Sequence, residues 1–167
     1  EPIAIAYASA KARDVLGQSP DRMEILCSGN IIKNVKGVMV PNSGGLRGVE
    51  IAAVLGVVGG DADRELEVLR EINSEHISHA QNLISKGFIT YTLAEGVANL
   101  YISATVYAGE HYARATIVNH HTSITELVRD DEILYQSADA QTESEMDWSC
   151  WSIQDILDFA DSTDLSL

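Results

Sequence analysis

Residues 28–45, SGNIIKNVKGVMVPNSGG, concentrate side chains that could bind a small charged ligand. Asn30, Asn34 and Asn42 offer neutral hydrogen-bond donors and acceptors, and Lys33 offers a point charge suited to a carboxylate. These groups follow the ends of two expected strands and precede an expected helix, where ligands collect in α/β folds. The stretch predicts a site for a small amino or hydroxy acid. The alternative is that the Asn and Gly residues serve turns and the lysines are solvated.

A second candidate is the string NHHTS at residues 119–123. His120 and His121 are adjacent at an expected strand end, so they point to opposite faces and cannot chelate one metal as a pair. One of them could act as a general acid or base near neutral pH. The alternative is a structural or exposed pair of histidines.

The other histidines and the cysteines are more simply explained by structural roles than by catalysis. His76 and His79 are three residues apart on an expected helix with only Glu75 as a neighbouring carboxylate, so we interpret them as surface residues. Cys27 ends an apolar strand, which favours a buried, inert thiol. A hydrolase or transferase that uses Cys27 would lack a paired base nearby in sequence. Two distant cysteines, Cys27 and Cys150, indicate reduced thiols and cannot by themselves hold an iron–sulfur cluster.

The elements that must position these groups follow from periodicity and turn signals. Helical spacing predicts three helices in this part of the chain, at residues 2–16, 46–58 and 61–87. The last of them is expected to have a break near Asn73. Period-two or short apolar runs predict strands at residues 23–27, 37–41, 88–96, 99–109, 110–121 and 132–136. The segment 121–130 is interpreted as a loop or a short turn of helix.

These elements predict an α/β (α+β) fold, with helices packed on a mixed, largely antiparallel sheet of about four to six strands. The dense apolar helix at residues 46–58 should be the most buried, and its glycines should let it approach the sheet closely. We assign residues 1–136 to this domain, residues 137–150 to an acidic linker and residues 151–167 to the first helix of a further, helical domain.

Charge and hydropathy exclude several classes of protein. Eleven Lys and Arg against twenty-five Asp and Glu give a net charge of −14. This argues against nucleic acid or an anionic membrane as a partner, because both require a positive surface. No apolar run reaches the roughly 18 residues that a membrane-spanning helix needs.

Three segments, EPIAIAYASAKARDVLG, SGNIIKNVKGVMVPNSGGLRGVEIAAVLGVVGGD and NHHTSI, resemble the L-cysteine desulfidase family. That family is related to the alpha chain of bacterial iron–sulfur L-serine dehydratases. The resemblance covers residues 1 to about 136 and the start of the helical region, and it implies that the chain is a fragment. Family members carry Gly-Cys-Thr directly before Glu1, so one expected cluster ligand precedes the chain and the others follow it.

The resemblance implies a β-elimination that converts L-cysteine to pyruvate, ammonia and sulfide, with a [4Fe–4S] cluster as the Lewis acid in the full-length protein. It implies no metal ligand in this chain and little activity for the chain alone. His121 is the candidate catalytic residue. The candidate substrate-binding residues are those on the family's polar and His-Thr motifs: Asn30, Lys33, Asn34, Asn42, Ser43 and Thr122.

Two alternatives stay open: an L-serine dehydratase domain, or a non-catalytic module that senses a small amino acid. Convergence of the polar stretch and the histidine loop toward the ends of the chain would favour the lyase. The expected partners are a small L-amino acid and the helical domain of the same protein, and a homodimer is left open. The expected compartment is the cytoplasm.

Overall fold

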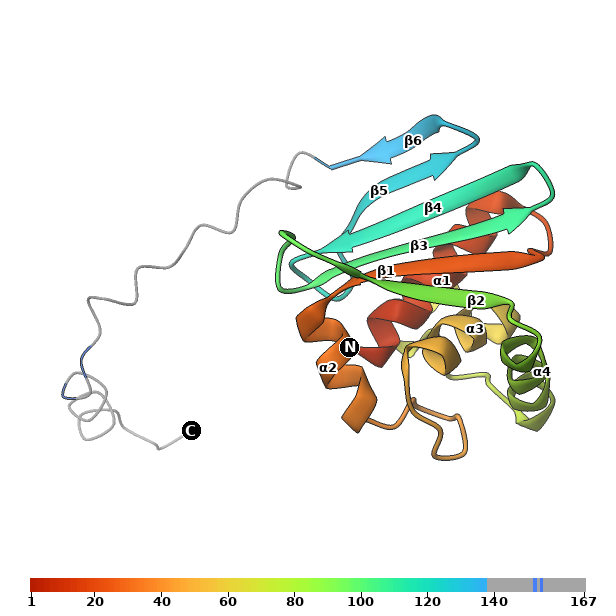
Figure 1. Ribbon diagram of the computed structural model, residues 1–167, viewed down its shortest axis with the longest axis horizontal. Helices are drawn as coiled ribbons and strands as arrows, with labels where there is room; N and C mark the ends of the chain where they lie inside the picture. Colours follow the sequence, from red (N-terminus) through yellow and green to blue (C-terminus); the bar gives the residue numbers. More distant parts are fainter. Residues whose placement is uncertain (138–151, 153, 155–167) are drawn as a thin grey trace.

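Six strands form one mixed sheet in the order β2-β1-β3-β4-β5-β6 (Figure 1). The structure is a computed structural model, and it describes residues 1–137, 152 and 154. The strands are β1 Arg22–Ser28, β2 Ile89–Ala94, β3 Tyr101–Ala108, β4 His111–Val118, β5 Ile124–Arg129 and β6 Glu132–Gln136. Only β1 and β2 pair in parallel, and every other pairing is antiparallel. The predicted fold class is therefore confirmed.

The helices lie together on one side of this sheet (Figure 1). They are α1 Pro2–Leu16, α2 Gly29–Gly37, α3 Val49–Gly59, the 3-10 helix η1 Ala62–Glu67 and α4 Ser74–Ser85. Helix α1 lies against β3 and β4, and α3 packs between α1 and α4. Pro2 in the first turn and left-handed Gly17 after the last turn bound α1, as the sequence predicts.

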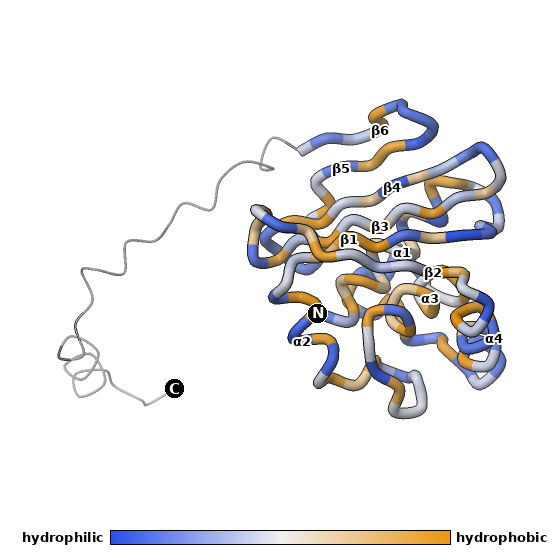
Figure 2. Tube along the Cα trace, viewed as in Figure 1, coloured by the Kyte–Doolittle hydropathy of each residue, from blue (hydrophilic) through white to orange (hydrophobic). Residues whose placement is uncertain are grey.

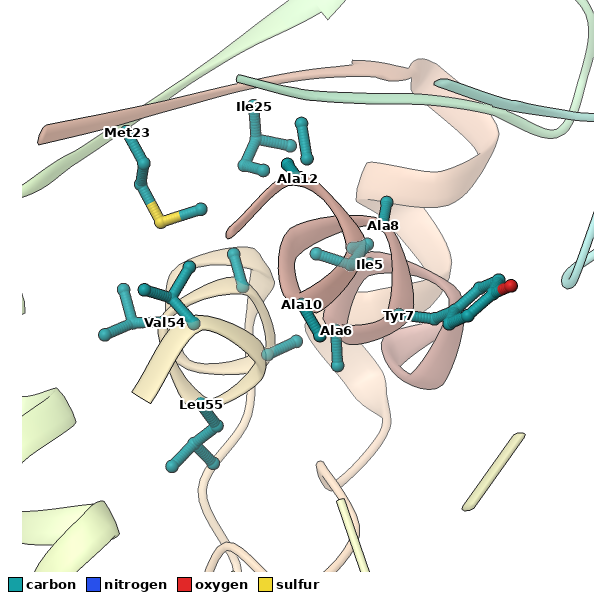
Figure 3. Close-up of a cluster of buried hydrophobic side chains, with 14 of the residues drawn as sticks. Ile5, Ala6, Tyr7, Ala8, Ala10, Ala12, Met23, Ile25, Val54 and Leu55 are labelled. Carbon is teal, nitrogen blue, oxygen red and sulfur yellow. The ribbon is translucent and has the colours of Figure 1, made fainter. Parts of the chain in front are cut away.

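The core lies between α1, α3 and the inner face of the sheet. Small residues of α1 and branched residues of α3 and β1 interdigitate there, as Figure 3 shows around Ile5, Val54 and Ile25. Along α3 nearly every side chain is buried, which confirms the predicted burial. The glycine prediction was wrong about the partner: a Cβ at Gly56 would lie 2.3 Å from the carbonyl oxygen of Ala6 on α1, so this glycine serves a helix–helix contact.

The period-two segments form the strands that the sequence predicts. Ile102, Ala104 and Val106 of β3 are fully buried beneath the helices, while the alternate side chains face the side of the sheet that carries no described helix. Strands β3 and β4 form a hairpin in which Gly109 takes a φ of 60°.

Three sequence-based assignments were wrong. The expected strand at residues 37–41 is reduced to a single bridge between Met39 and Arg47, and α2 occupies the residues before it. The segment 121–130 contains β5, whose register is set by pairing with β4 and β6. In the helix expected at 61–87 the predicted break near Asn73 is confirmed, because the Asn73 side chain caps α4. The part before the break is wrong: it is the short 3-10 helix η1 followed by turns and not an α-helix.

The remaining predictions concern the C-terminal part of the chain. The acidic linker, Cys150 and the helix expected at residues 151–167 lie, apart from Ser137, Ser152 and Gln154, outside the described residues. Among the helices that the structure describes, none has the length and apolar character needed to cross a bilayer.

Candidate functional site

Helix α2 places the first group of predicted site residues. The Ser28 hydroxyl accepts a hydrogen bond from the Ile31 backbone N–H at 3.4 Å and donates one to the Asn99 carbonyl at 2.6 Å. This N-cap starts the helix directly at the end of β1. Ile31 and Val35 turn inward and are fully buried, so Asn30 and Lys33 project into solvent.

Asn34 connects α2 to the start of the chain. Its side-chain nitrogen donates a hydrogen bond of 3.2 Å to the Glu1 carboxylate. Lys33 forms no ion pair with any described residue. Lys33 therefore presents a free ammonium group beside an amide that is already oriented by a carboxylate.

Asn42 and Ser43 lie in the turn after α2, and their polar atoms are occupied. Asn42 takes a φ of 56° and donates its side-chain N–H to the Leu69 carbonyl at 3.0 Å. Ser43 is 1% exposed, and its hydroxyl contacts the carbonyls of Val40 and Leu46. The structure thus gives these two residues a role in holding the turn.

Asn42 also lines a cleft of about 310 Å³ on the helical side of the molecule. Its other lining residues are Ile3, Pro41, Leu66, Glu67, Leu69 and Arg70. Lys33 and Asn34 do not line this cleft.

The histidine motif forms the turn between β4 and β5. Strand β4 ends at Val118, and Asn119 reverses the chain with a φ of 64°. His120 and His121 are both exposed on this turn and are not strand residues that face opposite sides of the sheet. Thr122 is half-buried.

Asn119 belongs to the predicted NHHTS motif, but the sequence reasoning assigned it no role of its own. Its side-chain oxygen is buried and has no hydrogen-bond partner among the described residues. Buried polar atoms are normally paired, so this oxygen is an acceptor without a donor at the base of the histidine turn. Asn is one of the few residues that adopt a left-handed conformation readily, which is the signal that could have marked the position.

We call the edge of the sheet where β1, β4 and β6 end the polar edge. The pairings of Cys27 with Ile102 and of Tyr101 with Val118 bring the end of β1, the start of β3 and the end of β4 together there. It carries the first turn of α2 and the histidine turn, segments far apart in the sequence (Figure 1). Glu1 reaches it through Asn34, and the chain leaves β6 there, where the Ser137 N–H bonds to the Thr125 carbonyl.

A trough of about 970 Å³ on the helix-free face of the sheet reaches this edge at Leu26, Tyr101 and Val118. Hydroxyl-bearing side chains line most of it, and Arg114 and Glu126 form an ion pair of 2.9 Å across it. The trough is as large as typical ligand sites, but it is open and polar where those are mostly apolar.

Cys27 behaves as the sequence predicts. The side chain is fully buried at the end of β1, and burial raises the pKa of its thiol to about 12. The thiol is therefore protonated and shielded near neutral pH, which excludes it as a nucleophile.

The other histidines and the acidic residues form no metal site within the described part of the chain, where no three His, Cys, Asp or Glu side chains gather. His79 is exposed, as predicted. His76 is half-buried, because its ring packs where a side chain at Gly59 would stand. The prediction of a surface residue was therefore wrong for His76.

Comparison with known proteins relates the chain to longer bacterial proteins. It is 40% identical to a UPF0597 protein of Treponema denticola over 165 residues, which is 97% of this chain and 38% of that protein. It is 41% identical to a UPF0597 protein of Finegoldia magna over 167 residues, covering 99% of this chain and 40% of that protein. A UPF0597 protein of Lachnoclostridium phytofermentans is 39% identical over 166 residues, 40% of its length.

The chain thus spans about two fifths of the length of these relatives. No family model matches the chain. No solved structure matches it either.

Proposed function

We propose that this chain forms the substrate side of an iron–sulfur-dependent lyase that converts L-cysteine to pyruvate, ammonia and sulfide. The polar edge is the observation that carries the proposal. It carries the start of α2, the helix to which Lys33 and Asn34 belong, and the histidine turn to which His121 and Thr122 belong, and the chain leaves β6 there (Figure 1). Groups supplied by the rest of a longer protein could meet the substrate at this edge.

The side chains of α2 would bind the amino acid. The Lys33 ammonium would pair with the substrate carboxylate. Asn34 gives its N–H to Glu1, which leaves its side-chain oxygen to accept from the substrate ammonium. Asn30 and Thr122 would supply further hydrogen bonds at the rim of the site.

His121 would move the proton. An imidazole nitrogen of His121 would take the α-proton, and the electron pair of that C–H bond would form the Cα–Cβ double bond. The Cβ–S bond breaks and the sulfur leaves as hydrosulfide. The resulting enamine tautomerises and takes up water to give pyruvate and ammonia.

The cluster would act as a Lewis acid on the leaving group when bound. The described residues do not fit a cluster, because Cys27 is enclosed in the core and no ligand group gathers elsewhere among them. We therefore assign its ligands to other parts of the protein. A redox-sensitive cluster and reduced thiols suit the cytoplasm, where we place the protein.

A second candidate is a non-catalytic module that senses a small amino acid. A catalytic histidine is usually oriented by a third group, yet the only histidine paired with a carboxylate among the described residues is His111, bonded to Asp130 at 2.9 Å. His111 begins β4 at the opposite edge of the sheet. His121 is exposed without such a partner, which favours a binding role.

The experiment uses the full-length protein, reconstituted with iron and sulfide without oxygen. Pyruvate and sulfide formation from L-cysteine, and pyruvate formation from L-serine, are compared for the wild type, Lys33→Ala and Asn34→Ala. We expect kcat/KM for L-cysteine to fall about 100-fold in Lys33→Ala, because a charged contact to the carboxylate is lost. Lys86→Ala, which removes an exposed lysine that has no ion pair among the described residues, is the matched control.

Each outcome distinguishes the candidates. Equal activity of all variants with an intact cluster spectrum would refute the assignment of α2 to the active site. Faster turnover of L-serine than of L-cysteine would instead identify the full-length protein as an L-serine dehydratase. Amino-acid binding by this chain without any turnover in the full-length protein would establish the sensing module instead.

A further inference from the structure

Helix α2 and the residues that follow it form a basic and apolar surface, which we call the basic patch: Lys33, Lys36, Val38, Met39 and Arg47. Lys33 and Lys36 are three residues apart on the exposed side of α2, and the bridge between Met39 and Arg47 brings the arginine beside Met39, three residues after Lys36. Val38 is 47% exposed and Met39 is 57% exposed. Hydrophilic and hydrophobic residues are interleaved along α2 (Figure 2).

The patch is distinguished by cations that have no partner. Within the described residues, six of the seven arginines form ion pairs, and Arg47 is the exception. None of the four lysines forms one. Three of the five unpaired cations therefore gather on one surface of a chain whose net charge is −14. Such a surface suits an acidic partner that also carries apolar side chains.

The C-terminal segment of the same chain, residues 138–167, has the complementary composition. Eight of the twenty-five Asp and Glu residues fall in it, and no Lys or Arg follows Arg129. Its apolar residues Trp151, Ile153, Ile156, Leu157 and Phe159 recur at helical spacing between aspartates. The segment matches the patch in both charge and apolar character.

The linker between the described domain and the apolar part of the C-terminal segment is long enough to reach the basic patch. The described domain ends at Ser137, at the polar edge, which also carries the first turn of α2. From β6 to β1 the sheet has four strand spacings, about 19 Å. The nine residues of α2, which lead from β1 to the patch, add at most about 13 Å. The thirteen residues 138–150 can span about 40 Å when extended.

We propose that residues 138–167 dock on the basic patch and cover α2. The aspartates of the segment neutralise Lys33, Lys36 and Arg47, while its apolar side chains cover Val38 and Met39. This inference does not depend on the lyase proposal.

The two tryptophans of the chain, Trp148 and Trp151, both lie in this segment, so tryptophan fluorescence reports on it alone. The experiment measures acrylamide quenching of the whole 167-residue chain, with a synthetic peptide of residues 138–167 as the unprotected reference. We compare the wild type with Lys36→Glu/Arg47→Glu, which leaves Lys33 in place. Lys11→Glu/Lys86→Glu changes the net charge equally at unpaired lysines outside the patch and is the matched control.

We expect the patch variant to raise the quenching constant about twofold toward that of the peptide, because the electrostatic contact is reversed. The control should stay near the wild type, and added salt should weaken the protection. Asp155→Lys/Asp158→Lys in the patch variant should restore part of it. Circular dichroism checks that each variant remains folded.

Three results would overturn the proposal: wild-type quenching equal to that of the peptide, equal effects of the patch and control variants, or protection that grows with protein concentration. The last would assign the patch to a second copy of the chain.

Discussion

The side chain of Cys27 illustrates how burial decides chemistry. The residue ends a strand at the polar edge, beside the candidate site, yet the thiol faces the core and is fully buried. With its pKa raised from 9.0 to about 12 by desolvation, it stays protonated in the folded state. A position next to a site therefore does not make this cysteine reactive.

The raised pKa of the Cys27 thiol predicts that the stability of the fold depends on pH. Between pH 9.0 and about 12 the unfolded chain loses the thiol proton while the folded chain keeps it. The free energy of unfolding should therefore fall with rising pH, by up to about 1.4 kcal/mol per pH unit from this group. Urea unfolding of Cys150→Ala across this range, compared with Cys27→Ala in the same background, isolates the contribution. Parallel pH profiles of the two proteins would contradict it.

Among the elements, α2 depends on its N-cap residue, Ser28. Ser28→Ala removes the oxygen that caps the Ile31 N–H and the hydroxyl that bonds to the Asn99 carbonyl. We expect a loss of about 1–2 kcal/mol in the free energy of unfolding, measured by denaturant titration. Ser85→Ala, which removes an exposed hydroxyl bonded within its own helix, should change it by less than about 0.5 kcal/mol. Equal effects of the two substitutions would show that the cap does not stabilise α2.

The contact between α1 and α3 gives a second prediction at this scale. Gly56→Ala would put a methyl group 2.3 Å from the Ala6 carbonyl oxygen, which backbone atoms of two packed helices cannot easily relieve. We expect a loss of about 2–3 kcal/mol in the free energy of unfolding. Gly37→Ala, at the end of α2 with no neighbour within 4 Å, should be neutral or slightly stabilising. A tolerated Gly56→Ala would mean that the helices separate at little cost.

The same elements show what the sequence could predict. Helix α1 and the β3–β4 hairpin carry clear local signals, namely a bounded helix and a period of two across a tight turn. Helix α2 was missed because Gly29, Asn30 and Gly37 weaken a helix of only nine residues, which holds through Ile31 and Val35 in the core.

Strand β5 was missed for a related reason. Its short apolar and polar alternation follows the polar histidine turn, and the strand is defined by pairing with β4 and β6 rather than by its own sequence. The candidate site was predicted only in part, because its geometry also depends on pairing between strands and not on local sequence. Lys33 and His121 could be proposed from their types, but the strand pairings that bring the start of α2 and the histidine turn to one edge join segments far apart in the sequence.

For the whole molecule, the outer edge of the sheet carries the last prediction. All five residues of β6 are exposed, and Ile133, Leu134 and Tyr135 are 56%, 50% and 48% exposed. Beyond β5, no described strand pairs with β6, so its backbone can accept a strand of a second copy. We expect the 167-residue chain to form dimers at roughly micromolar to millimolar concentration, and Leu134→Lys to weaken them at least about tenfold. Leu66→Lys, at an equally exposed leucine of η1, is the control. Sedimentation equilibrium measures all three, and a monomeric wild type, or equal weakening by both substitutions, would show that this edge is not where the copies meet.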